Sequence, residues 1–187
     1  MNLFGPASQD DSGQPGRLAL LFPGQGSQRA GMAARLLQIS RAARAVFEEA
    51  DRELEFSLSR LCVDADLSEL TDTENTQPAL LATSVAYFEH LRERLRETGS
   101  RIVPTLFAGH SLGQFSAAVA AESLPLTDGL QLVRERGRIM KEWAALRPGG
   151  LATIFGLSRE EVQAICEEVS DFEVVNVAVH NAPNQFV

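Results

Sequence analysis

Hydrophobic positions fall into short apolar runs and longer periodic stretches, which predict strands and helices respectively. Leu18–Phe22 is a short apolar run that ends at Pro23, as is typical of a buried strand entering a loop. From Arg29 to about Leu58 the spacing is helical, with a predicted break near Ser40. We therefore expect the ordered part of the chain to begin with a strand that is followed by helices.

A second helix and strand are predicted in the middle of the chain. Thr76–Pro78 is a favourable helix opening, because threonine can cap free amides and proline tolerates the first turn. This helix runs to Gly99 with apolar side chains at spacings of three and four, at Leu81, Val85, Phe88, Leu91 and Leu95. Thr105–Ala108 then has the character of a strand, and the Ala-rich segment after Ser111 has high helix propensity.

The pattern changes after a long predicted helix, Thr127–Leu146, which Pro148 ends. Beyond it we predict a strand at Leu151–Phe155, a helix from Ser158 to about Val169, and a strand at Glu173–Val179. This β-α-β order is typical of the start of a small α+β subdomain. Because no helix or strand is predicted to complete that unit, we expect the chain to be an N-terminal piece of a longer protein.

These patterns predict an α/β protein in three parts. Residues 1–16 are rich in Gly, Pro, Ser and Asp and lack periodicity, which predicts a disordered tail. Residues 17–147 are expected to form the first part of a large α/β core. Residues 148–187 are expected to form the incomplete small subdomain.

Composition narrows the class of protein. The 187 residues are 44% hydrophobic and 22% charged, as in an ordinary globular protein. Neither an apolar run long enough to span a bilayer nor a secretory leader is visible. The net charge of -8 argues against binding nucleic acid phosphates or anionic lipid. Cys62 and Cys166 are too few for a disulfide framework or a zinc site, so we expect a cytoplasmic protein without a metal.

Gly109-His-Ser-Leu-Gly113 matches the G-x-S-x-G pattern of a nucleophile elbow, between a predicted strand and a predicted helix. The glycines let the backbone turn sharply enough to project the Ser111 hydroxyl from the end of the sheet. The following helix would direct its free N–H groups at the same point, where an oxyanion develops during acyl transfer. A plain glycine-rich turn is the alternative.

A second glycine-containing loop, Phe22–Gln28, follows the first predicted strand. It lacks both the Lys-Ser/Thr ending of a phosphate-binding loop and the G-x-G-x-x-G spacing of a dinucleotide site. A loop in this position can instead lie beside the nucleophile and supply a second amide to the oxyanion hole.

Arg136 is the candidate substrate-binding residue on the long predicted helix. It falls near the middle of an apolar arc formed by Leu130, Leu132, Val133, Gly137, Ile139 and Met140. A guanidinium directed inward needs an anion. The sequence leaves two possibilities, a structural ion pair with a core carboxylate and a substrate carboxylate, and we favour the second.

None of the three histidines is a good candidate for the general base that a serine nucleophile requires. His110 adjoins Ser111, and adjacent side chains project apart, so we expect it to line the pocket. His90 is beside Glu89 in a position that is more often solvated. His180 belongs to the small subdomain.

Five segments in order resemble the malonyl-CoA:acyl-carrier-protein transacylases and the acyltransferase domains of polyketide and fatty acid synthases. They are FPGQGSQ, TQPALLATSVAYFEHL, GHSLGQFSAAVAA, LVRERGRIM and NAPNQ. The resemblance implies an α/β-hydrolase-like core with an inserted ferredoxin-like small subdomain, truncated here at the C-terminus. It also implies an acyl-serine at Ser111, oxyanion-hole amides from Gln25 and Leu112, and Arg136 as partner of the malonyl carboxylate. The base of that family is a histidine beyond the small subdomain, absent from this chain.

The expected function is transfer of malonyl from coenzyme A to the phosphopantetheine thiol of an acyl carrier protein, in fatty acid or polyketide synthesis. Coenzyme A thioester is then a substrate, no cofactor is held, and a C-terminal remainder of the domain is an expected partner. The alternatives are an acyl hydrolase on the same scaffold and a noncatalytic fragment that needs a complementary part. For the carrier, the basic stretch at Arg92, Arg94, Arg96 and Arg101 is either a docking patch or a solvated face.

Overall fold

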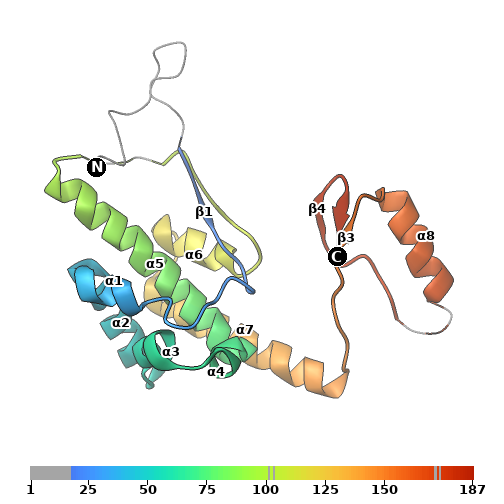
Figure 1. Ribbon diagram of the computed structural model, residues 1–187, viewed down its shortest axis with the longest axis horizontal. Coiled ribbons are helices and arrows are strands. Elements are labelled where there is room, and N and C mark those ends of the chain that lie inside the picture. Colours follow the sequence, from blue (N-terminus) through green and yellow to red (C-terminus); the bar gives the residue numbers. More distant parts are fainter. Residues whose placement is uncertain (1–17, 101, 103, 171, 173) are drawn as a thin grey trace, which may run out of the picture. The chain divides into compact units, whose positions relative to one another are not determined.

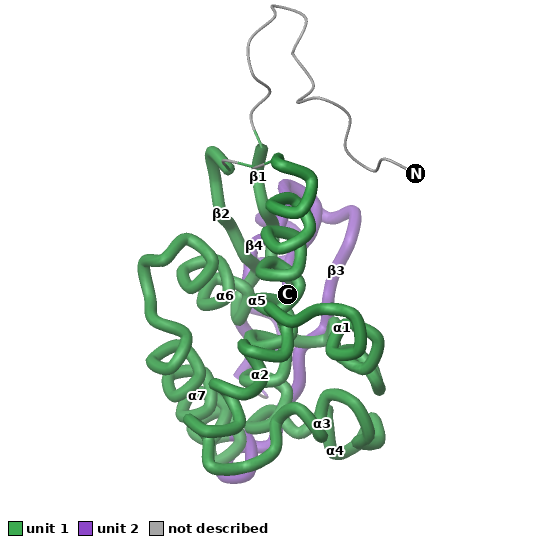
Figure 2. The backbone as a smooth tube through the Cα atoms, turned by 90° about the vertical axis from the view of Figure 1, so that its left-hand side faces the viewer, with its two compact units in different colours: residues 1–143 green, residues 144–187 purple. Residues whose placement is uncertain are grey.

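The fold is α/β, as predicted, and the computed structural model describes residues 18–100, 102, 104–170, 172 and 174–187 (Figure 1). The predicted disordered tail, residues 1–16, lies outside the described residues. The chain divides into two units, residues 1–143 and 144–187 (Figure 2). The predicted division at residue 148 places that boundary a few residues later.

The sheet of unit 1 pairs two strands that are far apart in the sequence. β1 (Ala19–Phe22) and β2 (Leu106–Gly109) lie side by side (Figure 2) and are parallel. In their register Phe22 is opposite Gly109. Because parallel strands end at the same edge of a sheet, the loop after β1 and the turn after β2 emerge side by side. Both predicted strands are thus confirmed.

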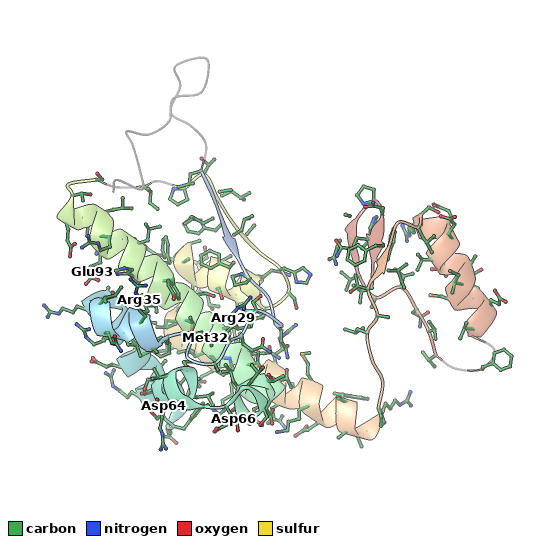
Figure 3. All side chains as sticks on the ribbon, in the orientation of Figure 1. Arg29, Met32, Arg35, Asp64, Asp66 and Glu93 are labelled. Atoms are coloured by element: carbon green, nitrogen blue, oxygen red, sulfur yellow. The ribbon has the colours of Figure 1, made fainter. Side chains whose placement is uncertain are left out.

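Four short helices follow β1, namely α1 (Ala34–Ile39), α2 (Arg41–Leu54), α3 (Leu58–Asp64) and α4 (Leu67–Thr71). The predicted break at Ser40 is confirmed, since this residue has extended backbone and its hydroxyl accepts a hydrogen bond from the Ala43 amide at 3.0 Å. Glu93, which lies on a later helix and is labelled in Figure 3, accepts from the Ser40 hydroxyl at 2.6 Å and from the Ala42 amide at 3.0 Å. The start of α2 is therefore capped twice.

The central helix, α5 (Thr73–Glu97), begins earlier than predicted. Asp72 is its N-cap and accepts from the Glu74 amide, so the prediction that Thr76 opens the helix is wrong. The Thr76 hydroxyl donates instead to the Leu70 carbonyl at 2.7 Å. Pro78 sits inside the helix, where its missing N–H removes one backbone hydrogen bond near the N-terminus. The helix packs against α2, α3, α4 and α6.

The last helices of unit 1 are α6 (Gly113–Ala120) and α7 (Leu126–Leu146). Leu130 and Val133 of α7 join the main core, which also takes side chains from α2, α3 and α5. The prediction of a fully inward apolar arc on α7 is wrong at three positions, because the following residues are exposed: Leu132, Ile139 and Met140.

Unit 2 contains a small antiparallel sheet and one helix. Its elements are β3 (Ile154–Phe155), α8 (Arg159–Val169), β4 (His180–Ala182) and β5 (Gln185–Phe186), with strand order β3-β5-β4. Ser158 and Glu161 form a capping box at the start of α8, which confirms the prediction that a helix begins at Ser158.

Two predictions for unit 2 need correction. The strand expected at Glu173–Val179 is absent from residues 174–179, and β4 lies immediately after them, while Glu173 itself is outside the described residues. The expectation that no strand follows is also wrong, because β5 pairs with both of its neighbours and buries Phe186. Residues 183 and 184 form the turn that joins β4 to β5.

Across the part of the chain that the structure describes, no helix is both long and apolar enough to cross a membrane.

Candidate active site

Ser111 lies in the sharp turn that joins β2 to α6, with φ of 51°. This left-handed conformation is uncommon for a residue with a side chain and is characteristic of strained functional turns. A Cβ on Gly109 would come within 2.0 Å of the Gly113 carbonyl group. Glycine is therefore required by close backbone contact within the turn, which is the geometry of a nucleophile elbow.

The loop after β1 packs directly against this elbow. A Cβ on Gly113 would lie 2.2 Å from the Phe22 carbonyl oxygen, and one on Gly24 would lie 2.6 Å from the His110 carbonyl oxygen. The His110 amide donates to the Phe22 carbonyl at 3.3 Å. The backbone of the Phe22–Gln28 loop is thus held against the turn that carries Ser111.

Two backbone amides, one in the Phe22–Gln28 loop and one directly after Ser111, are candidate donors. Among the described residues, neither the Gln25 amide nor the Leu112 amide donates a hydrogen bond. Leu112 is buried at the N-terminal end of α6, where the helix dipole is positive. These are the donors expected to form the oxyanion hole, and that role stays a prediction.

The structure brings Arg136 from α7 to Ser111. Its Nη2 donates to the Ser111 Oγ at 3.1 Å, and its Nη1 donates to the Gln77 Oε1 at 2.5 Å. Within the described part of the chain, no carboxylate pairs with this guanidinium. The alternative of a structural ion pair therefore finds no partner here, and the cation is held by neutral oxygens beside the serine.

Gln77 is a site residue that the sequence analysis missed. It is fully buried on α5, and its Nε2 donates to the Thr73 Oγ1 at 3.1 Å and contacts the Met140 sulfur at 3.3 Å. The Gln25 Nε2 also donates to the Thr73 Oγ1, at 3.0 Å. The sequence shows a glutamine in the TQPALL segment, but it reveals neither the burial of this side chain nor its partner on α7.

Charged pairs join the first turn of α5 to α7 around this site. Lys141 contacts Asp72 at 2.5 Å and Glu74 at 3.6 Å. The hydrogen bond from Lys141 lowers the pKa of Asp72, and the same bond raises the pKa of Lys141. The Arg134 guanidinium lies over the Phe56 ring, 4.5 Å from its centroid.

His90 is half-buried, with its side chain 20% exposed, and not solvated as expected, while the pocket-lining role of His110 stays a prediction. His110 is exposed, with its ring close to Gly24, and His90 contacts Glu93 at 3.5 Å. His180 is in unit 2, stacked on Phe186 with ring centroids 4.6 Å apart. Among the described residues, no histidine forms a hydrogen bond with the Ser111 hydroxyl, which accepts one from Arg136.

The basic stretch at the end of α5 is largely paired. Arg92 contacts Glu89 at 2.9 Å and Glu122 at 3.3 Å, and Arg94 pairs with Glu97. Arg101 is outside the described residues. These pairs favour the alternative of a solvated face over a dedicated docking patch.

Comparison with known proteins identifies the family. A family described as the acyl transferase domain matches residues 19–187. The chain belongs to this family. The resemblance inferred from the five sequence segments is therefore confirmed.

Named relatives of this acyl transferase domain agree with one another. The chain is 42% identical over 172 residues to a malonyl CoA-acyl carrier protein transacylase of Bacillus subtilis, covering 91% of this chain and 52% of the relative. It is 36% identical to a polyketide biosynthesis malonyl CoA-acyl carrier protein transacylase of the same species, of which it covers 55%.

Solved structures show the same likeness. A malonyl CoA-acyl carrier protein transacylase of Coxiella burnetii superposes with a TM-score of 0.78 at 35% identity, over 91% of this chain and 52% of that one. A type II polyketide synthase acyl-carrier protein in complex with its malonyl-transacylase gives a TM-score of 0.77 at 36% identity, over 91% of this chain and 54% of the matched one. The chain spans about half the length of these proteins.

Proposed function

We propose that the complete protein transfers a malonyl group from coenzyme A to the thiol of an acyl carrier protein through an ester on Ser111. The observation that carries the proposal is the 3.1 Å contact between Arg136 Nη2 and Ser111 Oγ. Arg136 has no carboxylate partner among the described residues. Its guanidinium lies beside the proposed nucleophile, which is in a strained elbow. Membership of the acyl transferase domain family and the names of the relatives support it.

In the proposed first step, the acyl group moves from coenzyme A to Ser111. The Ser111 Oγ attacks the thioester carbonyl carbon, the C–O bond forms, and the carbonyl electron pair moves to oxygen as an oxyanion. The amides of Gln25 and Leu112 would donate to this oxygen. When the oxyanion collapses, the C–S bond breaks, and coenzyme A leaves as a thiolate that receives the proton lost by the serine.

The second step is the reverse reaction with a different thiol. The thiol of the carrier attacks the serine ester, the C–O bond to Ser111 breaks, and the serine oxygen regains a proton. A relative solved as a complex of a malonyl-transacylase with its acyl-carrier protein supports this choice of acceptor.

The length of the malonyl group fits the position of Arg136. In a malonyl ester of Ser111 the carboxylate carbon is two C–C bonds, each about 1.5 Å, beyond the ester carbonyl. Its oxygens can therefore reach a guanidinium that already lies 3.1 Å from the serine oxygen. A neutral acyl chain gains nothing from this cation, which disfavours the hydrolase alternative.

A general base must accept the Ser111 proton, and no described side chain is placed to do so. We propose a histidine outside this chain, as the family resemblance implies. On the same ground we propose that unit 1 is part of an α/β-hydrolase-like core and unit 2 part of a ferredoxin-like subdomain. A cytoplasmic location is proposed as well, supported by the two free cysteines.

The proposal is tested with the full-length protein expressed from its gene, incubated with malonyl-CoA and a phosphopantetheinylated carrier protein. Mass spectrometry should show a malonyl group on the carrier, and omission of the enzyme is the control. Release of free malonate without loading of the carrier would establish the hydrolase instead.

A further inference from the structure

One threonine hydroxyl joins the two halves of the site. The Thr73 Oγ1 accepts a hydrogen bond from the Gln25 Nε2 at 3.0 Å and another from the Gln77 Nε2 at 3.1 Å. Gln25 belongs to the loop expected to contribute an oxyanion-hole amide, and Gln77 holds the Arg136 guanidinium. Thr73, in the first turn of α5, is thus hydrogen bonded both to the loop and to the glutamine that holds Arg136.

We infer that Thr73 and Gln77 are positioning residues that set the distance between the oxyanion hole and Arg136, and so select a short dicarboxylic acyl group. This inference rests on the proposed function. Neither side chain contacts the reacting atoms of the proposed acyl transfer. Each acts through a neighbour, Thr73 through the Gln25 loop and Gln77 through Arg136.

The hydrogen bonds of Gln77 fix its amide in one orientation. Its Oε1 faces Arg136, which has only donors, and its Nε2 faces the Thr73 hydroxyl. A flipped amide would place an NH₂ group against the guanidinium and leave both unpaired. Because Gln77 is fully buried, water cannot replace the lost partner, so Arg136 would lose its alignment.

Thr73 has the corresponding effect on the loop. The Gln25 side chain is exposed, and its contact with Thr73 crosses from the loop to α5. The next residue, Gly26, donates its amide to Gln28 within the loop at 2.8 Å. The contact with Thr73 therefore ties the Gln25 end of the loop to the same helical turn that orients Gln77.

The two residues should produce different kinetic defects. In the full-length protein, Thr73→Val removes the hydroxyl at nearly constant shape, and we expect about a tenfold lower kcat for both malonyl and acetyl transfer. Gln77→Met should raise the KM for malonyl-CoA about tenfold and affect acetyl transfer much less. Thr73→Ser should restore the wild-type rate because it restores the acceptor.

Controls separate these defects from a loss of folding. Thr127→Val alters a half-buried threonine near the start of α7 and should behave as wild type. Gln77→Glu keeps a hydrogen-bonded partner for Arg136, so it should stay folded, yet its carboxylate should compete with malonyl and raise KM. Thermal unfolding of every variant identifies any that lose stability.

The outcomes also separate this inference from the proposed function. If wild-type protein is not acylated by malonyl-CoA, the proposed function fails. If the wild type is acylated but Thr73→Val and Gln77→Glu match Thr127→Val in kcat and KM, the positioning role is overturned. Equal defects for malonyl and acetyl in Gln77→Glu would likewise contradict the selection of a dicarboxylic group.

Discussion

Gly137 of α7 lies against the Thr73 carbonyl oxygen at the start of α5, so closely that a Cβ would come within 2.6 Å of it. One residue earlier on the helix, Arg136 contacts Ser111. The approach of the two helices at a glycine therefore sets how far the guanidinium extends toward Ser111.

Gly137→Ala should force the two helices apart, because the nearest atoms are backbone and cannot rotate away. We expect a loss of about 1–3 kcal/mol in the free energy of unfolding and a larger drop in malonyl than in acetyl transfer. Urea unfolding and the two transfer rates measure these effects. The matched control is Gly150→Ala, where a Cβ meets nothing within 4 Å. Identical behaviour of both variants would show that this contact does not position Arg136.

Arg136→Ala should reduce selectivity for malonyl. Removing the charged partner of the substrate carboxylate is expected to cost about 1.5–3 kcal/mol in kcat/KM for malonyl-CoA and little for acetyl-CoA. Steady-state kinetics with both thioesters measure the difference. Arg136→Lys keeps the charge but loses the bidentate geometry, so its kcat/KM for malonyl-CoA should lie between those of wild type and Arg136→Ala. If both thioesters lose equally, Arg136 is structural.

The elbow was predictable because its signal is local. Gly109, Ser111 and Gly113 lie within five residues, and the contact that requires glycine at 109 is made with Gly113 in the same turn. The contact that requires glycine at 113 is made with Phe22, which is distant in the sequence and was not predictable. It was also predictable that Arg136 points inward and needs a partner, because it lies among apolar helix positions. The partner itself was not, since Gln77 is 59 residues away in the chain and its role depends on how α5 meets α7.

The errors have similar causes. Asp72 outcompetes Thr76 as N-cap because the Thr76 hydroxyl bonds to the Leu70 carbonyl of the preceding helix. In unit 2 the strand pairing of residues 180–186 decides where strands form, and alternation of side chains in one segment does not reveal its partner.

Cys62 should be unreactive in the folded protein. Burial raises the pKa of its thiol from 9.0 to about 12, so the thiolate that reacts is suppressed. In a Cys166→Ser background, alkylation by iodoacetamide near neutral pH should be at least about a hundredfold slower than in urea. Because the folded pKa is the higher one, this thiol's contribution to stability is complete below pH 9.0 and is lost as pH rises toward the folded value. Rapid alkylation without denaturant would contradict the burial.

Glu93 should make the protein sensitive to acid. The hydrogen bond from the Ser40 hydroxyl lowers the pKa of this carboxyl below 4.5. Its contribution to stability is therefore present above the unfolded pKa and is lost as pH falls through the lower folded value. Urea unfolding at about pH 6 and about pH 3 should show a smaller difference for Glu93→Gln than for wild type. Glu48→Gln, on the exposed side of α2, is the control, and an equal change there would place the effect elsewhere.

The central claim is that Ser111 carries the acyl group, and the most direct test is the intact mass of the protein after brief exposure to malonyl-CoA. The full-length protein should gain one malonyl group, and peptide mapping should place it on Ser111. Ser111→Ala, with the same fold by circular dichroism, should gain none. A malonyl adduct that persists in Ser111→Ala, or a folded wild-type protein that forms no adduct, would contradict the account.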